Sequence, residues 1–114
     1  MKLYEGRRTN PCHPHMRGGC VVTVQDTKRR GKAYPMPLPL RLDVDNHSPT
    51  GFEWGYGGSG PAQLALAILC DYLCDFKRAA ELHQPFKWAV IARLQHDTWS
   101  LSGSEIHRWL RNES

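Results

Sequence analysis

Residues 49–68 read PTGFEWGYGGSGPAQLALAI, and the chain changes character inside this stretch. An aromatic, strand-like run at 52–54 gives way to glycines at 55, 57, 58 and 60, with Gly51 just upstream. Glycine permits backbone conformations and close approaches that other residues do not. Pro61 then opens a long apolar run, and proline is well suited to the first turn of a helix. The stretch therefore predicts a tight strand-to-helix turn whose first N–H groups can bind an anion.

The chain after this turn is predicted to be helical. The helix that begins near Pro61 is expected to run to residue 76 and to be centrally buried, because its apolar residues surround most of its circumference. A second helical stretch at roughly 76–83 is expected to end before Pro85, which starts a third, PFKWAVIARL. Ser102 and Glu105 form an S-x-x-E capping box for a final helix, SEIHRWLRN, which we expect to dock through Ile106, Trp109 and Leu110.

The strand signals lie in the N-terminal half. KLYEG at 2–6 and CVVTV at 20–24 predict two strands. PMPLPLRLDVDN predicts a third, with one buried side and prolines suited to a sheet edge; its alternating residues are Leu38, Leu40, Leu42 and Val44. GFEWGY at 51–56 predicts a last short strand. Strands followed by helices indicate an α+β fold, with a small antiparallel sheet from the N-terminal half packed on three to four C-terminal helices.

Length and composition bound the class of protein. With 114 residues, 40% of them hydrophobic, the chain is expected to fold as one domain, 1–114, with 10–20 as a flexible insert. No apolar run approaches the length of a membrane span, and the N-terminus lacks the apolar segment of a secretion signal, so we expect a cytoplasmic protein with no membrane partner. Four cysteines in such a chain are expected to be reduced, with Cys70 and Cys74 on one helix face.

The net charge of +4 is unevenly distributed. Residues 1–41 carry nine Lys or Arg against two acids, whereas residues 42–114 carry six against nine. A basic half attracts phosphate, nucleic acid or an acidic protein surface. Its densest run consists of Lys28, Arg29, Arg30 and Lys32. Because Tyr34 is the sole aromatic residue nearby, reading of single-stranded bases is unsupported, and a nonspecific nucleic-acid binder stays as an alternative.

The glycine turn is the main candidate for a binding site. Residues 55–60 satisfy G-x-G-x-x-G, but helices follow where a dinucleotide-binding fold needs a parallel strand, and no Lys-Ser/Thr follows as in a P-loop. We expect a more general anion or ligand site instead, formed by Trp54, Tyr56, Gly57, Gly58, Ser59, Gly60 and Gln63. The alternative is a purely structural turn that needs glycine for close packing, with its N–H groups occupied by Glu53, Asp43 or Asp45.

Catalysis and metal binding have weaker signals. His47, Glu53 and Ser59 flank the turn and could supply an acid or base and a hydroxyl, so a small enzyme stays as a second alternative, with its catalytic residues unknown. Soft ligands gather in the insert, where Cys12, His13, His15 and Cys20 could be joined by Cys70 and Cys74. Their C-x2-H-x4-C spacing matches no standard zinc motif. We therefore predict neither a metal nor another cofactor.

Residues 46–69 read NHSPTGFEWGYGGSGPAQLALAIL, and shorter matching strings follow: FK at 86–87, WSLS at 99–102, EI at 105–106 and WL at 109–110. In these strings the chain resembles the DUF6166 type of small uncharacterised protein. Such proteins occur in bacteria, archaea and their phages. The resemblance covers roughly residues 34–110, with Tyr4-Glu5-Gly6 similar to the usual opening element and the insert at 12–20 outside the pattern. It implies no activity, and residence on mobile elements implies a host-interaction or anti-defence role.

Together these observations favour a non-enzymatic binding or inhibitor module of a phage or mobile element. We expect it to contact a host protein or an anionic ligand through the glycine-rich turn and the basic N-terminal edge. The enzyme and the nonspecific nucleic-acid binder are the two alternatives. The sequence does not specify an oligomeric state.

Overall fold

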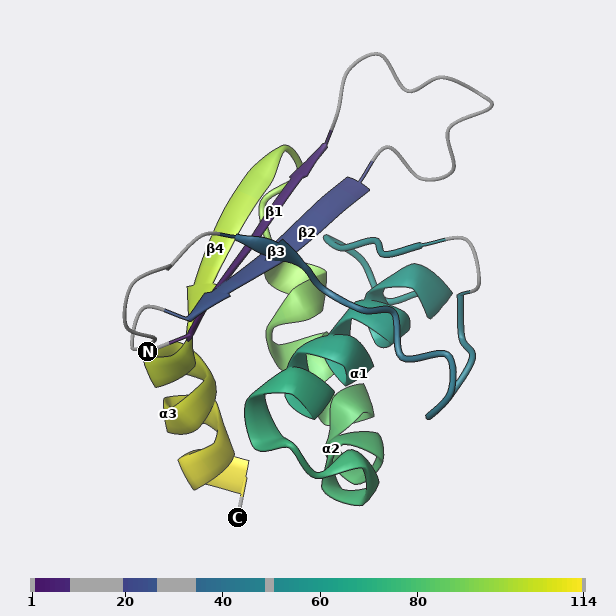
Figure 1. The fold of residues 1–114 in the computed structure, drawn as a ribbon, viewed down its shortest axis with the longest axis vertical. Coiled ribbons are helices and arrows are strands. Elements are labelled where there is room, and N and C mark those ends of the chain that lie inside the picture. Colours follow the sequence, from purple (N-terminus) through teal and green to yellow (C-terminus); the bar gives the residue numbers. More distant parts are fainter. Residues whose placement is uncertain (1, 9–19, 27–34, 49–50, 114) are drawn as a thin grey trace.

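The computed structural model describes residues 2–8, 20–26, 35–48 and 51–113, and it has an α+β fold (Figure 1). In chain order, the described elements are β1 (Lys2–Arg8), β2 (Cys20–Asp26), β3 (Met36–Pro37), α1 (Ser59–Leu73), α2 (Phe76–Ala89), the 3-10 helix η1 (Ile91–Arg93), β4 (Thr98–Ser102) and α3 (Gly103–Glu113). None of the helices in these ranges is long and apolar enough to cross a bilayer. The prediction of a single domain stays a prediction. Of the insert predicted at 10–20, residues 10–19 lie outside the described residues, whereas Cys20 is the first residue of β2.

The four described strands form one antiparallel sheet in the order β3-β2-β1-β4. The central strand β1 pairs with β2 along its whole length, and also with β4 from Leu3↔Ser102 to Arg7↔Thr98. Side chains alternate across a strand, so one face of the sheet carries the buried Tyr4, Val22, Trp99 and Leu101. This face packs on the helices. A Cβ at Gly6 would overlap the indole of Trp99, so the ring lies directly over the backbone of β1.

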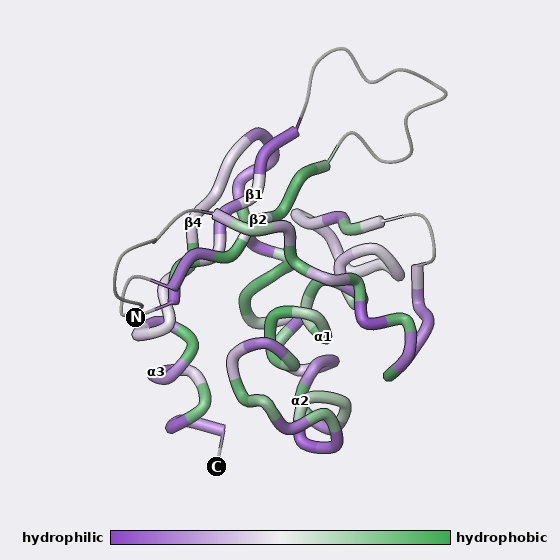
Figure 2. The backbone as a smooth tube through the Cα atoms, viewed as in Figure 1, coloured by the Kyte–Doolittle hydropathy of each residue, from purple (hydrophilic) through white to green (hydrophobic). Residues whose placement is uncertain are grey.

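Helix α1 supplies much of the core. All eleven residues from Gly60 to Cys70 are buried, which fits a helix that is apolar around most of its circumference (Figure 2). It packs against α2 and contacts η1. At its C-terminal end, the Tyr4 hydroxyl donates a 2.6 Å hydrogen bond to the Asp71 carboxylate and ties the end of the helix to β1. The helix stops at Cys74, a left-handed cap, so Cys70 is buried while Cys74 is exposed.

The predicted break at Pro85 is wrong. Helix α2 runs from Phe76 to Ala89 with Pro85 inside it, and the predicted third helix is replaced by the end of α2 and the short η1. Proline deprives the carbonyl four residues earlier of its hydrogen bond. Here that carbonyl belongs to Glu81, and both Glu81 and Pro85 are exposed, so water can replace the missing bond.

Two predicted strands are also corrected. Of the strand predicted over PMPLPLRLDVDN, the structure forms only the two residues of β3, at the sheet edge, with a further bond from the Leu38 N–H to the Val22 carbonyl. Arg41 takes a positive φ of 62° and starts a turn, so no strand continues through it. Leu38 is buried as expected, whereas Leu42 is exposed. No strand forms at 51–56, where Gly51 and Gly55 have φ of 136° and 86° and interrupt any ladder.

The sheet does not come from the N-terminal half alone, because β4 completes it from the C-terminal half. Strand β4 was not predicted from the sequence, although the alternation in TWSLS is typical of a strand: Trp99 and Leu101 are buried between polar residues. The capping box that follows is confirmed: the Glu105 N–H donates to the Ser102 hydroxyl at 3.2 Å. Ile106 and Leu110 are buried, and the half-buried Trp109 packs edge-on against Phe86.

Candidate functional site

The glycine-rich turn leads directly into α1. Gly58 is the N-cap residue, in an extended conformation and without a capping side chain. The sequence predicts that N–H groups at this helix start bind an anion, but the Ala62 N–H already donates to the Gly58 carbonyl at 3.0 Å, and Pro61 has no N–H. The N–H groups that lack an intrahelical acceptor are therefore those at the helix start, on Ser59 and Gly60. Ser59 is exposed, whereas Gly60 is buried.

Two exposed aromatic rings lie on this bare backbone. A Cβ at Gly57 would overlap the indole of Trp88, and a Cβ at Gly58 would come within 2.5 Å of the Tyr56 ring. Tyr56 is 52% exposed and Trp88 58% exposed. The Lys87 ammonium lies 4.5 Å from the centroid of the Trp88 ring, a cation–π contact. Glycine at 57 and 58 thus leaves room for two aromatic rings to pack directly against the backbone.

Close packing explains a third glycine. A Cβ at Gly60 would lie 2.5 Å from the Glu53 Cβ, so this glycine lets the extended segment at 52–54 pass against the first turn of α1. The structural alternative predicted from the sequence therefore applies to Gly60. Its second part does not: the carboxylates of Glu53, Asp43 and Asp45 contact Arg8, Arg41 and His47, not the turn amides.

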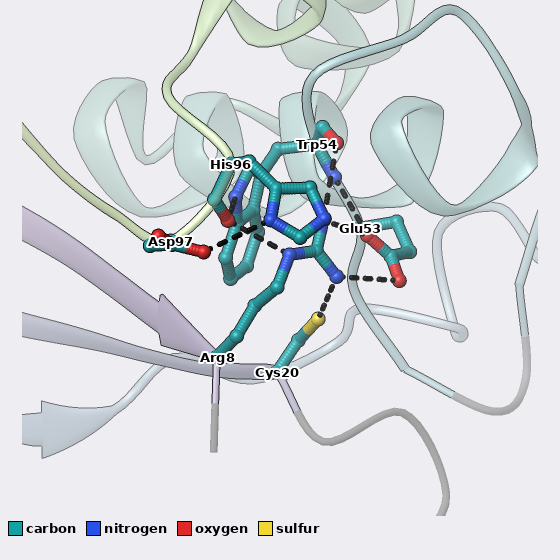
Figure 3. A network of polar contacts seen from close by, with 6 residues as sticks. All are labelled: Arg8, Cys20, Glu53, Trp54, His96 and Asp97. Carbon is teal, nitrogen blue, oxygen red and sulfur yellow. Dashed lines mark hydrogen bonds and ion pairs between the residues drawn. The ribbon is translucent and has the colours of Figure 1, made fainter. Parts of the chain in front are cut away.

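A polar network holds the segment before the turn to the sheet (Figure 3). The Arg8 guanidinium, at the end of β1, donates to both carboxylate oxygens of Glu53, at 2.7 and 3.0 Å. The same side chain donates to the His96 carbonyl at 2.7 Å and to the Cys20 sulfur at 3.2 Å, and it stacks 4.9 Å from the Trp54 ring centroid. One side chain thus joins β1, β2, the 53–54 segment and the loop before β4.

The ion pair also sets the protonation state of Glu53. Partial burial alone would raise the pKa of its carboxyl, but hydrogen bonds and the positive charge of Arg8 outweigh that effect and lower it. Glu53 is therefore a carboxylate at neutral pH, engaged by a planar two-point donor. Both oxygens accept from Arg8, so the Glu53 side chain ties the 53–54 segment to the end of β1.

Two residues predicted to bind ligand are core residues instead. Trp54 is 1% exposed, packs edge-on against Trp99 at 5.6 Å and donates its indole N–H to the His96 carbonyl, so it offers no surface to a ligand. Gln63 is fully buried in α1. Its amide oxygen accepts from the His47 and Ser48 N–H groups, and its amide nitrogen donates to the Leu40 and Asp45 carbonyls. Gln63 therefore fastens the 40–48 loop to α1.

The same loop brings a histidine to α2. The Nε2 atoms of His47 and His83 are 2.9 Å apart, and the Asp45 carboxylate lies 3.2 Å from the His47 Nε2. Burial lowers the pKa of His83, and the neighbouring His47 adds to the effect, so the ring is neutral at neutral pH. The sequence analysis grouped His47 with Glu53 and Ser59. In the structure His47 contacts His83, while Glu53 contacts Arg8 and Ser59 lies at the exposed helix start.

An open groove of about 860 Å³ lies along β1, β2 and β4 and is closed on one side by the 93–95 loop. Its charged lining residues are Glu5, Arg7 and Arg93. None of the residues predicted to bind ligand lines it. Because the groove is open and carries both charges, it does not select a ligand class.

The basic run of Lys28, Arg29, Arg30 and Lys32 lies outside the described residues, as do Cys12, His13 and His15. Comparison with known proteins adds one finding. A family model described as DUF6166, a family of unknown function, matches residues 4–112. No curated protein and no solved structure matches the chain.

Proposed function

This chain belongs to the DUF6166 family, and we propose that it is a non-enzymatic binding or inhibitor module. Its contact surface would be the aromatic turn surface, defined as Tyr56, Gly57, Gly58, Ser59 and Trp88. The observation that carries the proposal is the pair of large aromatic side chains, both more than half exposed, seated on glycine backbone at a helix start. The partner we propose is a protein that presents an acidic side chain beside apolar groups.

Two large exposed rings, Tyr56 from the turn and Trp88 from α2, lie against neighbouring glycines, and their exposure calls for an explanation. Tyr and Trp are enriched among the few residues that carry most of the energy of protein interfaces. A ring that already rests on backbone loses little freedom when a partner covers it, so less of the interaction energy goes into ordering it. The Arg8 network holds the 53–54 segment in place, and the Gly55 N–H donates to the Ile91 carbonyl. The backbone that leads into the aromatic turn surface is therefore fixed to the rest of the fold.

The charge at this surface favours an acidic partner. The start of α1 carries a partial positive charge and the N–H groups of Ser59 and Gly60. Lys87, on the adjoining part of α2, is a buried residue, and its ammonium adds positive charge 4.5 Å from the centroid of the Trp88 ring. A carboxylate of the partner could accept from the helix start while its apolar neighbours cover the rings. As predicted from the sequence, the basic run at 28–32 would be a further contact for an acidic partner. In the mobile-element setting that the family resemblance implies, the partner would be a cytoplasmic host protein.

The test compares three alanine variants of exposed aromatic residues. The tagged full chain is used to capture partners from a host lysate, and the dissociation constant of the purified pair is then measured by calorimetry. Trp88→Ala and Tyr56→Ala should each weaken binding about tenfold or more, as for an interface anchor. Phe76→Ala, at an exposed ring at the start of α2, is the matched control and should change the constant less than about twofold.

Two outcomes would count against the proposal. A partner that binds Trp88→Ala and Tyr56→Ala as tightly as wild type would show that the contact surface lies elsewhere. Binding of labelled DNA or RNA that falls steeply with salt and is unaffected by either variant would favour the nucleic-acid alternative. All three variants should fold, with melting temperatures within about 5 °C of wild type, because each removed side chain is about half exposed.

A further inference from the structure

We propose that Asp45, His47 and His83 bind a divalent transition-metal ion, for which Zn²⁺ is the best fit. The three residues are called the His–His–Asp site below. Among the described residues they are the group of His, Cys, Asp and Glu side chains whose ligand atoms converge, all within 4.8 Å of one another. The site is separate from the aromatic turn surface, so either proposal can fail without the other.

The separation of the two imidazoles is close to what a metal needs. Tetrahedral zinc with Zn–N bonds of about 2.0–2.1 Å places two nitrogen ligands roughly 3.3 Å apart. The two Nε2 atoms are 2.9 Å apart, and the Asp45 oxygen lies 3.2 Å from one of them. These two pairs therefore need shifts of only a few tenths of an ångström. The third pair, Asp45 with His83, lies within 4.8 Å, and rotation of the half-exposed Asp45 side chain would bring its carboxylate to the ion.

The tautomer of His83 points the same way. Its Nδ1 lies 2.6 Å from the Ala80 carbonyl, which can only accept, so Nδ1 carries the hydrogen. With the hydrogen on Nδ1, the ring presents the Nε2 lone pair toward His47. A backbone carbonyl that fixes the far nitrogen is the usual support of a metal-binding histidine. His83 is buried in α2, so its ring is also held in place by packing.

The other two ligands sit on a loop that is held by a buried side chain. Gln63 donates to the Asp45 carbonyl and accepts from the His47 N–H, at 3.1 and 2.8 Å. Both ligand-bearing residues are thus fixed to α1 through their backbones. A loop held in this way lowers the entropy lost on metal binding, because the ligands already face one another.

The donor set selects the class of ion. Two imidazole nitrogens and one carboxylate suit zinc and its neighbours in the first transition row, whereas calcium and magnesium prefer oxygen ligands alone. Three protein ligands leave a position for water or for a group from another molecule. The Gln84 amide nitrogen lies 3.3 Å from the His83 Nε2.

The probe is Co²⁺, which reports its coordination by visible absorption, followed by displacement with Zn²⁺. The full chain is freed of metal with a chelator and titrated, and stoichiometry is measured by calorimetry. We expect one equivalent to bind at micromolar concentration. His47→Gln and His83→Gln should each weaken binding about 100-fold, and Asp45→Asn about tenfold. His107→Gln, at an exposed histidine on α3, should leave it unchanged.

Because Cys12, His13 and His15 are further ligand-type residues, the double variant His13→Gln/His15→Gln is measured alongside. Retention of binding there, with loss in the three site variants, supports the proposal. No binding at micromolar Co²⁺ or Zn²⁺ would overturn it, as would binding that is lost in the double variant and kept in His83→Gln. If His83→Gln fails to fold, Asp45→Asn still decides, since its carboxylate is about half exposed and not part of the core.

Discussion

Gln63→Met tests the claim that one buried amide holds the 40–48 loop on α1. Methionine fills a similar volume, so the substitution removes hydrogen bonds without opening a cavity. Gln63 makes four of them, between 2.6 and 3.1 Å, to backbone groups of Leu40, Asp45, His47 and Ser48. At about 0.5–1.5 kcal/mol each, their loss would cost roughly 2–6 kcal/mol. Water can reach part of the loop, so we expect about 2–4 kcal/mol.

The free energy of unfolding is measured by urea titration, followed by tryptophan fluorescence. The melting temperature should fall by on the order of 10 °C, as expected for a domain of this size. Gln95→Met, at an exposed loop glutamine, is the matched control and should lie within about 0.5 kcal/mol of wild type.

Gln63→Glu separates the two ends of the amide. A carboxylate can still accept from the His47 and Ser48 N–H groups, but it cannot donate to the Leu40 and Asp45 carbonyls. This variant should be more destabilised at neutral pH than in mildly acidic buffer, where a protonated side chain regains one donor. If Gln63→Met is as stable as Gln95→Met, the loop is held by other contacts and the reasoning is wrong.

Three further predictions concern the core, the turn and the ion pair. Leu69→Ala, at a fully buried position of α1, should lower the free energy of unfolding by about 2–5 kcal/mol in a denaturant titration. Gly60→Ala should cost about 1–3 kcal/mol because its methyl meets the Glu53 Cβ, whereas Gly58→Ala meets an exposed ring that can turn away and should cost less than about 1 kcal/mol; equal losses would contradict this difference. Because Arg8 lowers the pKa of Glu53 in the folded state, the ion pair stabilises above the ordinary carboxyl pKa of about 4.3 and the benefit is lost as pH falls through the lowered value. Glu53→Gln should therefore lower stability at neutral pH and flatten this part of the pH profile, measured by chemical denaturation at several pH values.

Patterns of neighbouring residues were sufficient to predict several helices and strands. The strands β1 and β2, the start of α1 after the glycines and the capping box of α3 all depend on neighbouring residues. The Ser102–Glu105 pair is a clear case, because both partners lie within one turn of the helix that they cap. Family membership follows from the sequence as well, through the long string at 46–69.

Long-range packing decided what local rules could not. Pro85 is a helix breaker by local preference, yet α2 continues through it because the carbonyl it deprives is exposed to water. Residues 38–44 have the alternation of a strand, and the Leu38 N–H still donates to the Val22 carbonyl, but the anchoring of Leu40 by Gln63 and the turn at Arg41 take the following residues away from the sheet. The TWSLS strand finds its partner β1 about 90 residues earlier in the chain, and no local pattern specifies that pairing.

The candidate sites divide in the same way. The glycine turn and Tyr56 are evident from the sequence, because glycine density and an aromatic side chain are local properties. Trp54 and Gln63 lie in the same stretch, but only the fold decides that they are buried. The contact of His47 with His83 joins residues 36 apart, through a loop and a helix that pack separately on α1. A sequence specifies which side chains are present, whereas the burial and convergence of distant side chains depend on how the elements pack.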